Sequence, residues 1–405
     1  MRALVFDLSI PKYLAAKAIG RQLPAMYDGA GSCLSLRDDE PRPALPGSDW
    51  VRLRPIATGI CGSDLGVVYF KMSAALSAYG PKRFVMGHEV LARVVGVGNQ
   101  VKGLREGDRV VVDPWLRCDL RGVPACSRCA VDEYATCERA GTGPLLGVML
   151  GGCAELPGGF AEEMVAHESQ CFALSDAVSD ARGVLAEPVS VAVHAVLRNP
   201  PRHAERVLVI GGGPIAFAMV FALEELAKQA DVTLYTLEPA QTAVAELLGA
   251  ERAWAPNGEP LLARAARLTG ATQLRPALGP GFLAGGFDRV FDCVGSAGSL
   301  GDAFSMVRAG GTIVMVGAAG KLSEVELSHL WTKEVSLVGT YSYGYERWRE
   351  TRQRTFAITR ELLTGTTRPL ERLVTHHLTL GDYQRALRMN LDRRASGAIK
   401  IVLAP

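Results

Sequence analysis

Short apolar runs bounded by glycine recur through the second half of the chain. Val207–Ile210 is an uninterrupted run of valine, leucine and isoleucine, and Val232–Leu237, Phe287–Gly295 and Gly310–Gly317 are comparable stretches. Continuous apolar runs of this length are typical of strands buried on both faces, as in a parallel sheet. A long apolar segment of helical character follows the first run. The pattern predicts an α/β unit with a parallel sheet.

The remaining segments predict a more mixed structure. Polar and apolar residues alternate in Ser48–Ile60, which predicts a strand. Two glycine-rich stretches, Gly141–Gly159 and 257–286, predict a mobile insertion and a short helix with a long loop. The other expected elements are strands at Arg2–Leu8, Trp331–Thr340 and Ala398–Leu403, and helices at Tyr13–Ile19, Val184–Leu197, Ala243–Gly249, Arg349–Leu363 and Leu380–Asn390.

The turn after Val207–Ile210 has the spacing of a dinucleotide-binding fingerprint. Gly211, Gly213 and Ala216 occupy the three small positions of the G-x-G-x-x-G/A pattern, which serve a tight turn, a pyrophosphate and close packing of the helix on the strand. Glu238, after the next strand, lies at the distance expected of a ribose-binding acid. A transmembrane helix over Val207–Leu223 is the alternative, and the three glycines and one proline within it argue against that.

Length and composition set broad limits. A chain of 405 residues predicts two domains, and 48% hydrophobic with 21% charged residues is ordinary for a globular protein. A net charge of +2 and a pI near 8.1 favour neither a nucleic-acid nor a membrane partner. The N-terminal segment carries an acid within its apolar run, unlike a signal peptide, so we expect a cytoplasmic protein.

Four of the nine cysteines crowd together, at Cys118, Cys126, Cys129 and Cys137. An odd number of cysteines in a large chain argues against a secreted disulfide framework. A redox pair formed by Cys126 and Cys129 remains open, although such pairs usually lie at a helix start near a βαβ pattern. A bound metal ion explains all four residues together.

A second set of metal-ligand types is dispersed along the chain. Cys61 lies in GICGSD, His88 and Glu89 in GHEV, and Glu187 in an otherwise apolar run, AEPVSV. A thiolate, an imidazole and a carboxylate are ligands that Zn²⁺ accepts, and a catalytic zinc keeps one position open. Each residue alone has a structural explanation as a buried cysteine, a packed histidine or a strand-edge charge. A carboxylate in an apolar run, however, needs a partner.

Taken in order, GICGSD, GHEVLARVVGVG, the four cysteines, AEPVSVAVHA and the glycine turn resemble the zinc-dependent medium-chain alcohol/polyol dehydrogenases. The similarity runs from Trp50 to Val402. It implies a GroES-like, β-rich catalytic domain and a doubly wound Rossmann domain. The implied boundaries are 1–195 for the first part of the catalytic domain, 196–340 for the dinucleotide-binding domain, and 341–405 for the return to the catalytic domain.

The resemblance also implies roles for individual residues. Cys61 and His88 would bind a catalytic zinc, with Glu187 and Glu89 as the third and a near or exchangeable ligand, in an order that the sequence leaves open. Ser63 would bind the substrate oxygen and pass on its proton, and Asp64 would orient His88. Together these give catalytic residues Cys61, Ser63, His88 and Glu187, and a structural zinc on Cys118, Cys126, Cys129 and Cys137.

Two departures from the family pattern affect the chemistry. Gly66 replaces the relay histidine that many relatives carry, so the proton must leave by another path. The first gap of the cysteine cluster is longer than usual, which lengthens a loop without keeping four thiolates apart. The loops that would build a substrate pocket match no pattern, which leaves the substrate open and suggests one larger than ethanol.

The cofactor implied is a nicotinamide dinucleotide. Thr236 aligns with the NAD-selecting aspartate, but Glu238 and the absence of Arg or Lys in the segment that follows favour NAD, with NADP possible. The expected cofactor-binding residues are Gly211, Gly213, Pro214, Ile215, Thr236, Glu238, Val294, Gly295 and Gly317.

The predicted function is hydride transfer between the nicotinamide and an alcohol or carbonyl, on a secondary alcohol or a polyol-like substrate. The protein would contain two zinc ions per chain and form a homodimer or homotetramer. Two alternatives remain. One is a zinc-free enoyl or quinone reductase of the same superfamily, which the presence of Cys61, His88 and Glu187 disfavours. The other is a catalytically silent NAD(P)-binding protein, whose one support is Gly66.

Overall fold

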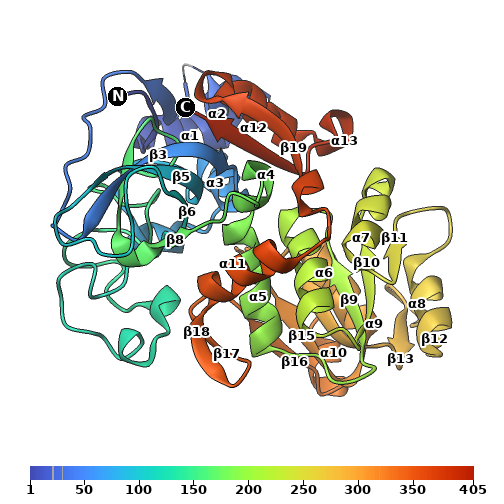
Figure 1. Cartoon of the computed structure of the whole chain (residues 1–405). Coiled ribbons are helices and arrows are strands. Elements are labelled where there is room, and N and C mark those ends of the chain that lie inside the picture. The colour runs from blue at the N-terminus through green and yellow to red at the C-terminus, as the bar shows by residue number, and fades with distance from the viewer. Residues whose placement is uncertain (21, 30, 319) are drawn as a thin grey trace. The chain divides into compact units, whose positions relative to one another are not determined.

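The computed structural model describes residues 1–405 except 21, 30 and 319. The chain forms two compact units (Figure 1). Unit 1 comprises Met1–Glu187, Phe356–Thr366 and Val374–Pro405, and unit 2 comprises Pro188–Thr355 and Thr367–Leu373. The domain limits expected from the sequence, 195/196 and 340/341, stay a prediction. No helix in the described ranges is long and apolar enough to cross a membrane.

Unit 1 is rich in antiparallel strands and contains both chain termini. Its larger sheet runs β19-β20-β3-β5-β6-β8, with β7 also paired to β3, and its smaller sheet runs β2-β1-β4. The β-rich architecture confirms the GroES-like fold expected for the first domain. Its strands are β1 (Ala3–Asp7), β2 (Leu34–Arg37), β3 (Trp50–Gly59), β4 (Arg83–Val85), β5 (Glu89–Val97), β6 (Arg109–Val112), β7 (Met164–His167), β8 (Cys171–Ala173), β19 (Val374–Thr379) and β20 (Lys400–Ala404).

The helices of unit 1 are short. Alternate residues of β3 enter the core, where Val51 and Leu53 are fully buried. The helices are α1 (Ile10–Ile19), α2 (Ala25–Asp28), α3 (Gly62–Val68), α4 (Asp180–Gly183), α11 (Thr355–Gly365, beginning in unit 2), α12 (Tyr383–Leu391) and α13 (Arg393–Ser396), and α5 (Ala186–Arg198) begins in this unit.

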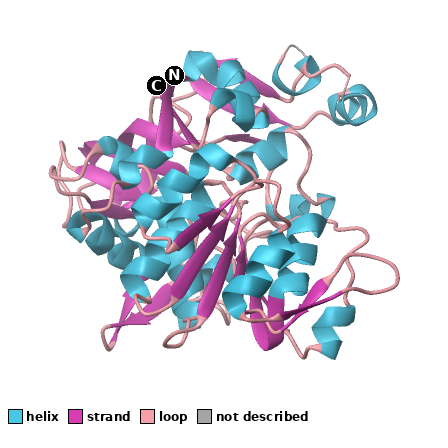
Figure 2. Ribbon diagram, turned by 90° about the vertical axis from the view of Figure 1, so that its right-hand side faces the viewer, coloured by secondary structure: helices cyan, strands magenta, loops and turns pink. Residues whose placement is uncertain are grey.

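Unit 2 is built on a six-stranded parallel sheet in the order β11-β10-β9-β14-β15-β16. Figure 2 shows these strands side by side between helices. This doubly wound order places a switch point between β9 and β14, where open α/β sheets bind ligands. The strands are β9 (Arg206–Ile210), β10 (Asp231–Tyr235), β11 (Arg252–Trp254), β14 (Phe287–Asp292), β15 (Val307–Met315) and β16 (Ser336–Gly339).

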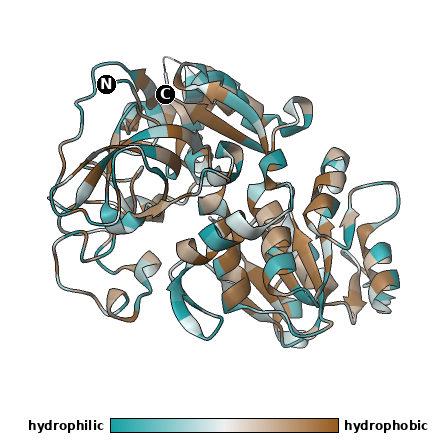
Figure 3. Ribbon diagram, in the orientation of Figure 1, coloured by the Kyte–Doolittle hydropathy of each residue, from teal (hydrophilic) through white to brown (hydrophobic). Residues whose placement is uncertain are grey.

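The apolar runs of the sequence form the centre of this sheet. Val207, Leu208 and Val209 are fully buried in β9, and the central strands are mostly brown in the hydropathy view of Figure 3. The Rossmann prediction is thereby confirmed. The helices are α6 (Pro214–Leu226), α7 (Thr242–Leu248), α8 (Leu261–Thr269), α9 (Ala297–Met306) and α10 (Ser328–Thr332).

Four expected elements were wrong in part. The loop expected within 257–286 contains the hairpin β12 (Thr272–Leu274) and β13 (Phe282–Ala284) after α8. The helix expected from Arg349 begins at Thr355, because the hairpin β17 (Tyr345–Trp348) and β18 (Thr351–Arg354) precedes it.

The strand expected over Trp331–Thr340 is limited to Ser336–Gly339, because the residues before it close α10. The stretch expected to be a mobile insertion, Gly141–Gly159, sends Leu150, Cys153 and Leu156 into the core of unit 1.

Candidate active site

The first site residues lie where β3 passes into α3. Cys61 caps the helix with extended backbone, and its amide donates a hydrogen bond to Oδ2 of Asp64 at 2.9 Å. An acid at the third helical position satisfies an amide that the helix itself leaves unpaired. The motif GICGSD therefore forms a capped helix start that fixes Cys61 and Asp64 relative to each other.

His88 and Glu89 reach the same place from the start of β5. Gly87, which precedes them, has a φ of +98°, and a Cβ there would lie 2.7 Å from the amide nitrogen of Phe160. Glycine is required at such a turn. Ligand atoms of Cys61, His88 and Glu89 all lie within 4.8 Å of one another. The fold thus gathers a thiol, an imidazole and a carboxylate from two distant segments.

The surroundings of His88 suit a metal-binding imidazole. Its Nδ1 lies 3.4 Å from Oδ1 of Asp64, with both side chains buried, and within the described chain this nitrogen makes no hydrogen bond. Burial alone lowers the pKa of His88, but the carboxylate of Asp64 and the thiol of Cys61 outweigh burial and raise it well above its usual value. A zinc ion, which takes neutral imidazole paired with such a carboxylate, fits this donor set.

Glu89 has a second partner that the sequence analysis missed. Nζ of Lys400 lies 2.7 Å from Oε1 and 2.5 Å from Oε2 of Glu89, and it also donates to the carbonyl oxygen of Ile60 at 3.1 Å. Both charged side chains are 2% exposed or less. Paired in this way, each charge compensates the cost of burying the other. The signal was available: Lys400 is the one charge in the apolar run Ala398–Leu403.

The other expected catalytic residues are placed less completely. Ser63 is half-buried in the first turn of α3, and its hydroxyl makes no hydrogen bond within the described chain. Glu187 is buried in the first turn of α5. It is not part of the three-residue cluster found among the described residues, so its role as a ligand stays a prediction.

The position of the missing relay histidine is filled from elsewhere. A Cβ on Gly66 would lie 2.7 Å from Sδ and 2.8 Å from Cγ of Met72. Gly66 itself is buried, with the thioether of Met72 packed against it. A histidine could occupy this position only if Met72 moved. The glycine that replaces the relay histidine is therefore accompanied by a side chain, Met72, that fills the space beside it.

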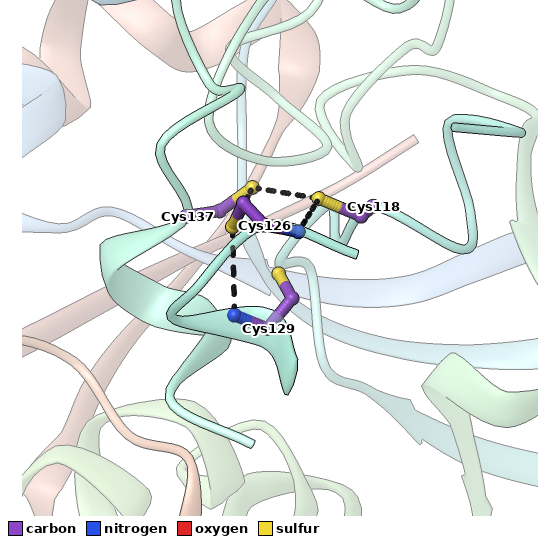
Figure 4. Close-up of side chains that lie close together, drawn as sticks. All are labelled: Cys118, Cys126, Cys129 and Cys137. Atoms are coloured by element: carbon purple, nitrogen blue, oxygen red, sulfur yellow. Dashed lines mark hydrogen bonds between the residues drawn. The ribbon is translucent and has the colours of Figure 1, made fainter. Parts of the chain in front are cut away.

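The four clustered cysteines converge in a loop of unit 1 (Figure 4). Sγ of Cys137 lies 3.6 Å from Sγ of Cys118 and 4.0 Å from Sγ of Cys126, and all four sulfurs lie within 4.8 Å of one another. A tetrahedral zinc with Zn–S bonds of about 2.3 Å places its sulfurs about 3.8 Å apart. All four cysteines are free thiols. The geometry fits a structural zinc, and the expected longer first gap did not keep the sulfurs apart.

The electrostatics of this cluster point to a cation as well. Burial raises the pKa of Cys126, but the backbone amide of Cys129 and other donors outweigh it and lower the pKa to about 6. Burial raises the pKa of Cys129, and it also raises that of Cys137. The neighbouring thiolates also raise the pKa of Cys129 and of Cys137 by charge repulsion. A zinc ion would hold all four as thiolates.

Several predicted cofactor residues meet at one edge of the sheet in unit 2. Gly211 has a φ of +140°, and a Cβ there would lie 3.3 Å from Cγ2 of Val294. A Cβ on Gly317 would lie 2.4 Å from the amide nitrogen of Gly295. Buried Asp292 accepts hydrogen bonds from the amides of Val294 at 2.9 Å and Gly295 at 3.1 Å. At Gly317 the neighbouring backbone comes so close that a side chain would not fit, and at Gly211 the positive φ favours glycine.

The start of α6 has the features expected of a pyrophosphate site. Gly213 caps the helix with extended backbone and Pro214 begins it, followed by half-buried Ile215. Gly212 was overlooked in the sequence: a Cβ there would lie 2.1 Å from Oε1 of Gln241 and 2.3 Å from Oγ1 of Thr236. Unpaired helix amides at such a turn attract anions. The middle glycine of the run is thus required by packing.

Thr236 and Glu238 differ in whether their side chains are already hydrogen-bonded within the protein. Thr236 is 1% exposed, and its hydroxyl is hydrogen-bonded to Oε1 of Gln241 at 2.8 Å. It also accepts a hydrogen bond from the amide of Glu238 at 3.2 Å. The side chain of Glu238 is half-buried after β10. Of the two candidates for selecting the ribose, Glu238 is the one whose side chain makes no hydrogen bond or ion pair with the described residues.

The fold, the two ligand clusters and the glycine turn define a class of protein, a zinc-dependent oxidoreductase that uses a nicotinamide dinucleotide. Comparison with known proteins agrees with this class. Residues 47–176 match the alcohol dehydrogenase GroES-like domain, and residues 218–357 match the zinc-binding dehydrogenase domain.

Individual relatives cover nearly all of the chain. L-idonate 5-dehydrogenase of Vitis vinifera is 28% identical over 354 residues, 87% of each chain. Sorbitol dehydrogenase of Homo sapiens is 28% identical over 369 residues, 91% of this chain and 92% of the relative. The crystal structure of 2R,3R-butanediol dehydrogenase from Bacillus subtilis is 25% identical, with a TM-score of 0.70, over 92% of this chain and 96% of that chain.

The chain belongs to the zinc-dependent medium-chain dehydrogenase/reductase family. It is an NAD(P)-dependent alcohol dehydrogenase in class, transferring hydride between the nicotinamide and an alcohol or carbonyl. Zinc and the dinucleotide are its cofactors. The individual site residues stay predictions, as do the preference for NAD and the metal content per chain.

Proposed function

We propose that this chain interconverts a polyol, or another secondary alcohol, with the matching ketone at a zinc site that includes Cys61 and His88. The observation that carries the proposal is the gathering of Cys61, His88 and Glu89 within 4.8 Å beside a helix start that holds Asp64. The sorbitol and L-idonate dehydrogenases among the relatives support the substrate class. Unit 1 would be the catalytic domain and unit 2 the dinucleotide-binding domain.

A bound zinc supplies a Lewis acid for the alcohol oxygen. Around it, Asp64 would orient the ring of His88, and the hydroxyl of Ser63 would hydrogen-bond the substrate oxygen and accept its proton while passing its own proton on. Because Lys400 already binds both carboxylate oxygens of Glu89, we assign the third protein ligand to Glu187 and leave Glu89 beside the metal. Because position 66 is a glycine packed against Met72, the proton would leave Ser63 through water, the cofactor ribose or another side chain.

For the cofactor, we propose NAD rather than NADP. Glu238 offers a carboxylate to the two ribose hydroxyls and would repel a 2′-phosphate. The segment Glu238-Pro-Ala-Gln-Thr-Ala contains no lysine or arginine to pair with one. Titration with NADH and with NADPH, followed by nicotinamide fluorescence, should give the lower Kd for NADH.

A second metal site and an oligomeric state are also proposed. We propose a second, structural zinc on the four clustered cysteines, and a homodimer or homotetramer in the cytoplasm. β16 lies at one edge of the six-stranded sheet, and Leu337 within it is 36% exposed. Tyr341, just beyond the strand, is 55% exposed. Unpaired strand edges are favourable places for a second copy to add its own edge.

The test is metal content and turnover in the same preparation. We expect wild-type protein purified without added zinc to contain about two zinc ions per chain and to oxidise members of a polyol panel with NAD. His88→Ala should lower zinc to about one per chain and reduce turnover by about 10³-fold or more while NADH still binds. Glu187→Gln should lower zinc content more than Glu89→Gln does. Full zinc and full activity in His88→Ala would refute the site.

A further inference from the structure

The segment that joins β1 to β2 is longer than the fold requires. These strands are antiparallel neighbours, which a turn of two residues can join. Residues 8–33 instead contain α1 and α2. The ring of Tyr13 in α1 contacts that of Phe70, just beyond α3, edge-on with 4.9 Å between ring centres, and Nζ of Lys17 donates to the carbonyl oxygen of Phe70 at 2.8 Å. The segment is therefore an addition to unit 1 that is held against the end of α3.

The side of α1 that is turned away from Phe70 is apolar throughout. Tyr13 and the fully buried Ala16 lie on the inner side of the helix. At 3.6 residues per turn, the opposite side carries Ile10, Pro11, Leu14, Ala15, Ala18 and Ile19. The three large side chains of this set, Ile10, Leu14 and Ile19, are between 47% and 59% exposed. Apolar residues that gather on an exposed surface in this way mark an interaction site, and we call this side the apolar face of α1.

Two lysines border the apolar face of α1. By the same helical spacing Lys12 and Lys17 lie at its two edges, and both are exposed. Their Nζ atoms donate to the carbonyl oxygens of Ser32 and Phe70, each at 2.8 Å. In the described chain neither lysine pairs with a carboxylate. The helix thus presents an apolar surface between two positive charges that no acid neutralises.

The surrounding chain adds no exposed acid to this region. Asp28 is the one acid between residues 8 and 36, and it is buried, with its carboxylate oxygens bound by Arg388 at 2.7 and 3.2 Å. Lys71, which follows Phe70, is a further exposed cation. The net charge of +2 for the whole chain gave no sign of this region, because it averages over acids that lie elsewhere.

We propose that the apolar face of α1 docks on the surface of an anionic lipid bilayer. A helix with an apolar face bordered by lysines lies in the plane of a membrane interface, with its apolar side chains at the acyl chains and its ammonium groups at the lipid phosphates. Such docking requires no helix that crosses the membrane. The inference does not depend on the proposed function.

A protein partner fits the same surface less well. In a two-fold contact between two copies of this chain, the same patch of each copy faces the other, so that uncompensated lysines would meet lysines. Stable protein complexes bury roughly 800 Å² on each partner. One helix face with three half-exposed large side chains offers far less than this, whereas a few inserted side chains and nearby cations are enough to hold a protein at an anionic membrane.

The experiment measures co-sedimentation of the full-length protein with lipid vesicles. One set of vesicles contains phosphatidylcholine alone, and the other contains equal parts of phosphatidylcholine and phosphatidylserine. We expect binding to the anionic vesicles only. Binding should weaken as the salt concentration rises from about 0.05 M to about 0.5 M, because salt screens the attraction between lysines and lipid phosphates.

Matched variants separate the apolar face from the rest of the surface. Leu14→Glu should reduce binding to anionic vesicles by about tenfold or more, because it places a carboxylate in the apolar face. Leu278→Glu changes a leucine of unit 2 that is 91% exposed and should leave binding within about twofold. Lys17→Gln should reduce binding by about fivefold, and Lys102→Gln, at an exposed lysine elsewhere in unit 1, by less than about twofold. Melting temperatures verify folding, and Leu14→Gln replaces the glutamate variant if that variant does not fold.

Three results would overturn the inference. The first is a wild-type protein that binds neither kind of vesicle at low salt. The second is equal vesicle binding by Leu14→Glu and Leu278→Glu. The third is a Leu14→Glu variant whose mass in analytical ultracentrifugation is lower than that of wild type, which would show that a second copy of the chain covers the face. Turnover is not part of any of these measurements, so their outcome leaves the polyol function to its own test.

Discussion

The two clusters of potential zinc ligands are assembled in opposite ways. Cys118, Cys126, Cys129 and Cys137 come from one local loop and supply four ligands of a single kind. Cys61, His88 and Glu89 come from two segments, and Lys400, the partner of Glu89, comes from the far end of the chain. The first cluster supplies four thiols, a full set for zinc, while the second supplies three donors of different kinds. We refer to them as the closed site and the open site.

This difference corresponds to two uses of the same metal. A closed set of four thiolates saturates zinc and stabilises a loop. A mixed set of fewer ligands leaves a coordination position for substrate, and nearby groups such as Asp64 and Ser63 can then act on it. Substitutions in the first cluster should therefore affect mainly stability, and substitutions around the second mainly turnover.

The largest effect should follow loss of the closed site. We expect Cys118→Ser to lower zinc from about two to about one per chain and to reduce the free energy of unfolding by on the order of 5 kcal/mol, because metal binding there is coupled to folding of the loop. Thermal melting with metal analysis tests this. A variant that keeps two zinc ions or melts like wild type would contradict a structural role.

Breaking the buried ion pair behind the open site should be the next largest effect. Lys400→Met leaves the carboxylate of Glu89 buried without a counter-charge, and we expect a loss of about 3–5 kcal/mol in denaturant unfolding. Lys400→Met combined with Glu89→Gln removes both charges and should recover most of that loss. If the double variant is as unstable as the single one, the pair is not the cause.

A smaller effect is expected from the hydroxyl beside the open site. Ser63→Ala should reduce kcat by about 10²-fold, because the hydroxyl proposed to take the substrate proton is lost, while zinc content stays at about two. Ser63→Thr, which keeps the hydroxyl, is the control. Unchanged kcat at saturating substrate would remove Ser63 from the mechanism.

The smallest effect concerns Lys333, a buried cation of unit 2, and tests the pH dependence of stability. Nζ of Lys333 donates to the carbonyls of Phe304 at 3.0 Å and Val307 at 2.9 Å, and burial lowers its pKa to about 8. The unfolded chain therefore binds the proton more tightly between about pH 8 and pH 10.5, the usual lysine value, so this group adds stability as the pH rises through that window. Lys333→Met should flatten that rise in a series of melts. An unchanged slope would show that Lys333 is not its source.

Local spacing predicted much of the fold and of both clusters. The apolar runs of the parallel sheet, the glycine turn and the four cysteines were each recognisable in the sequence, because each depends on residues that are close together in the chain. The hairpins at Thr272–Ala284 and Tyr345–Arg354 were missed, since their strands are short and carry no clear alternation. The need for Gly212 was missed for a different reason: Gln241, which it must avoid, lies on another element.

The sequence by itself determined the family, the fold class and the candidate ligands, because motif spacing and apolar periodicity are properties of neighbouring residues. Only the tertiary structure decided which partners those ligands have. Lys400 reaches Glu89, and Met72 fills the space beside Gly66, because strand register and packing bring distant residues together. Burial and charge pairing depend on such long-range contacts, which no local pattern in the chain contains.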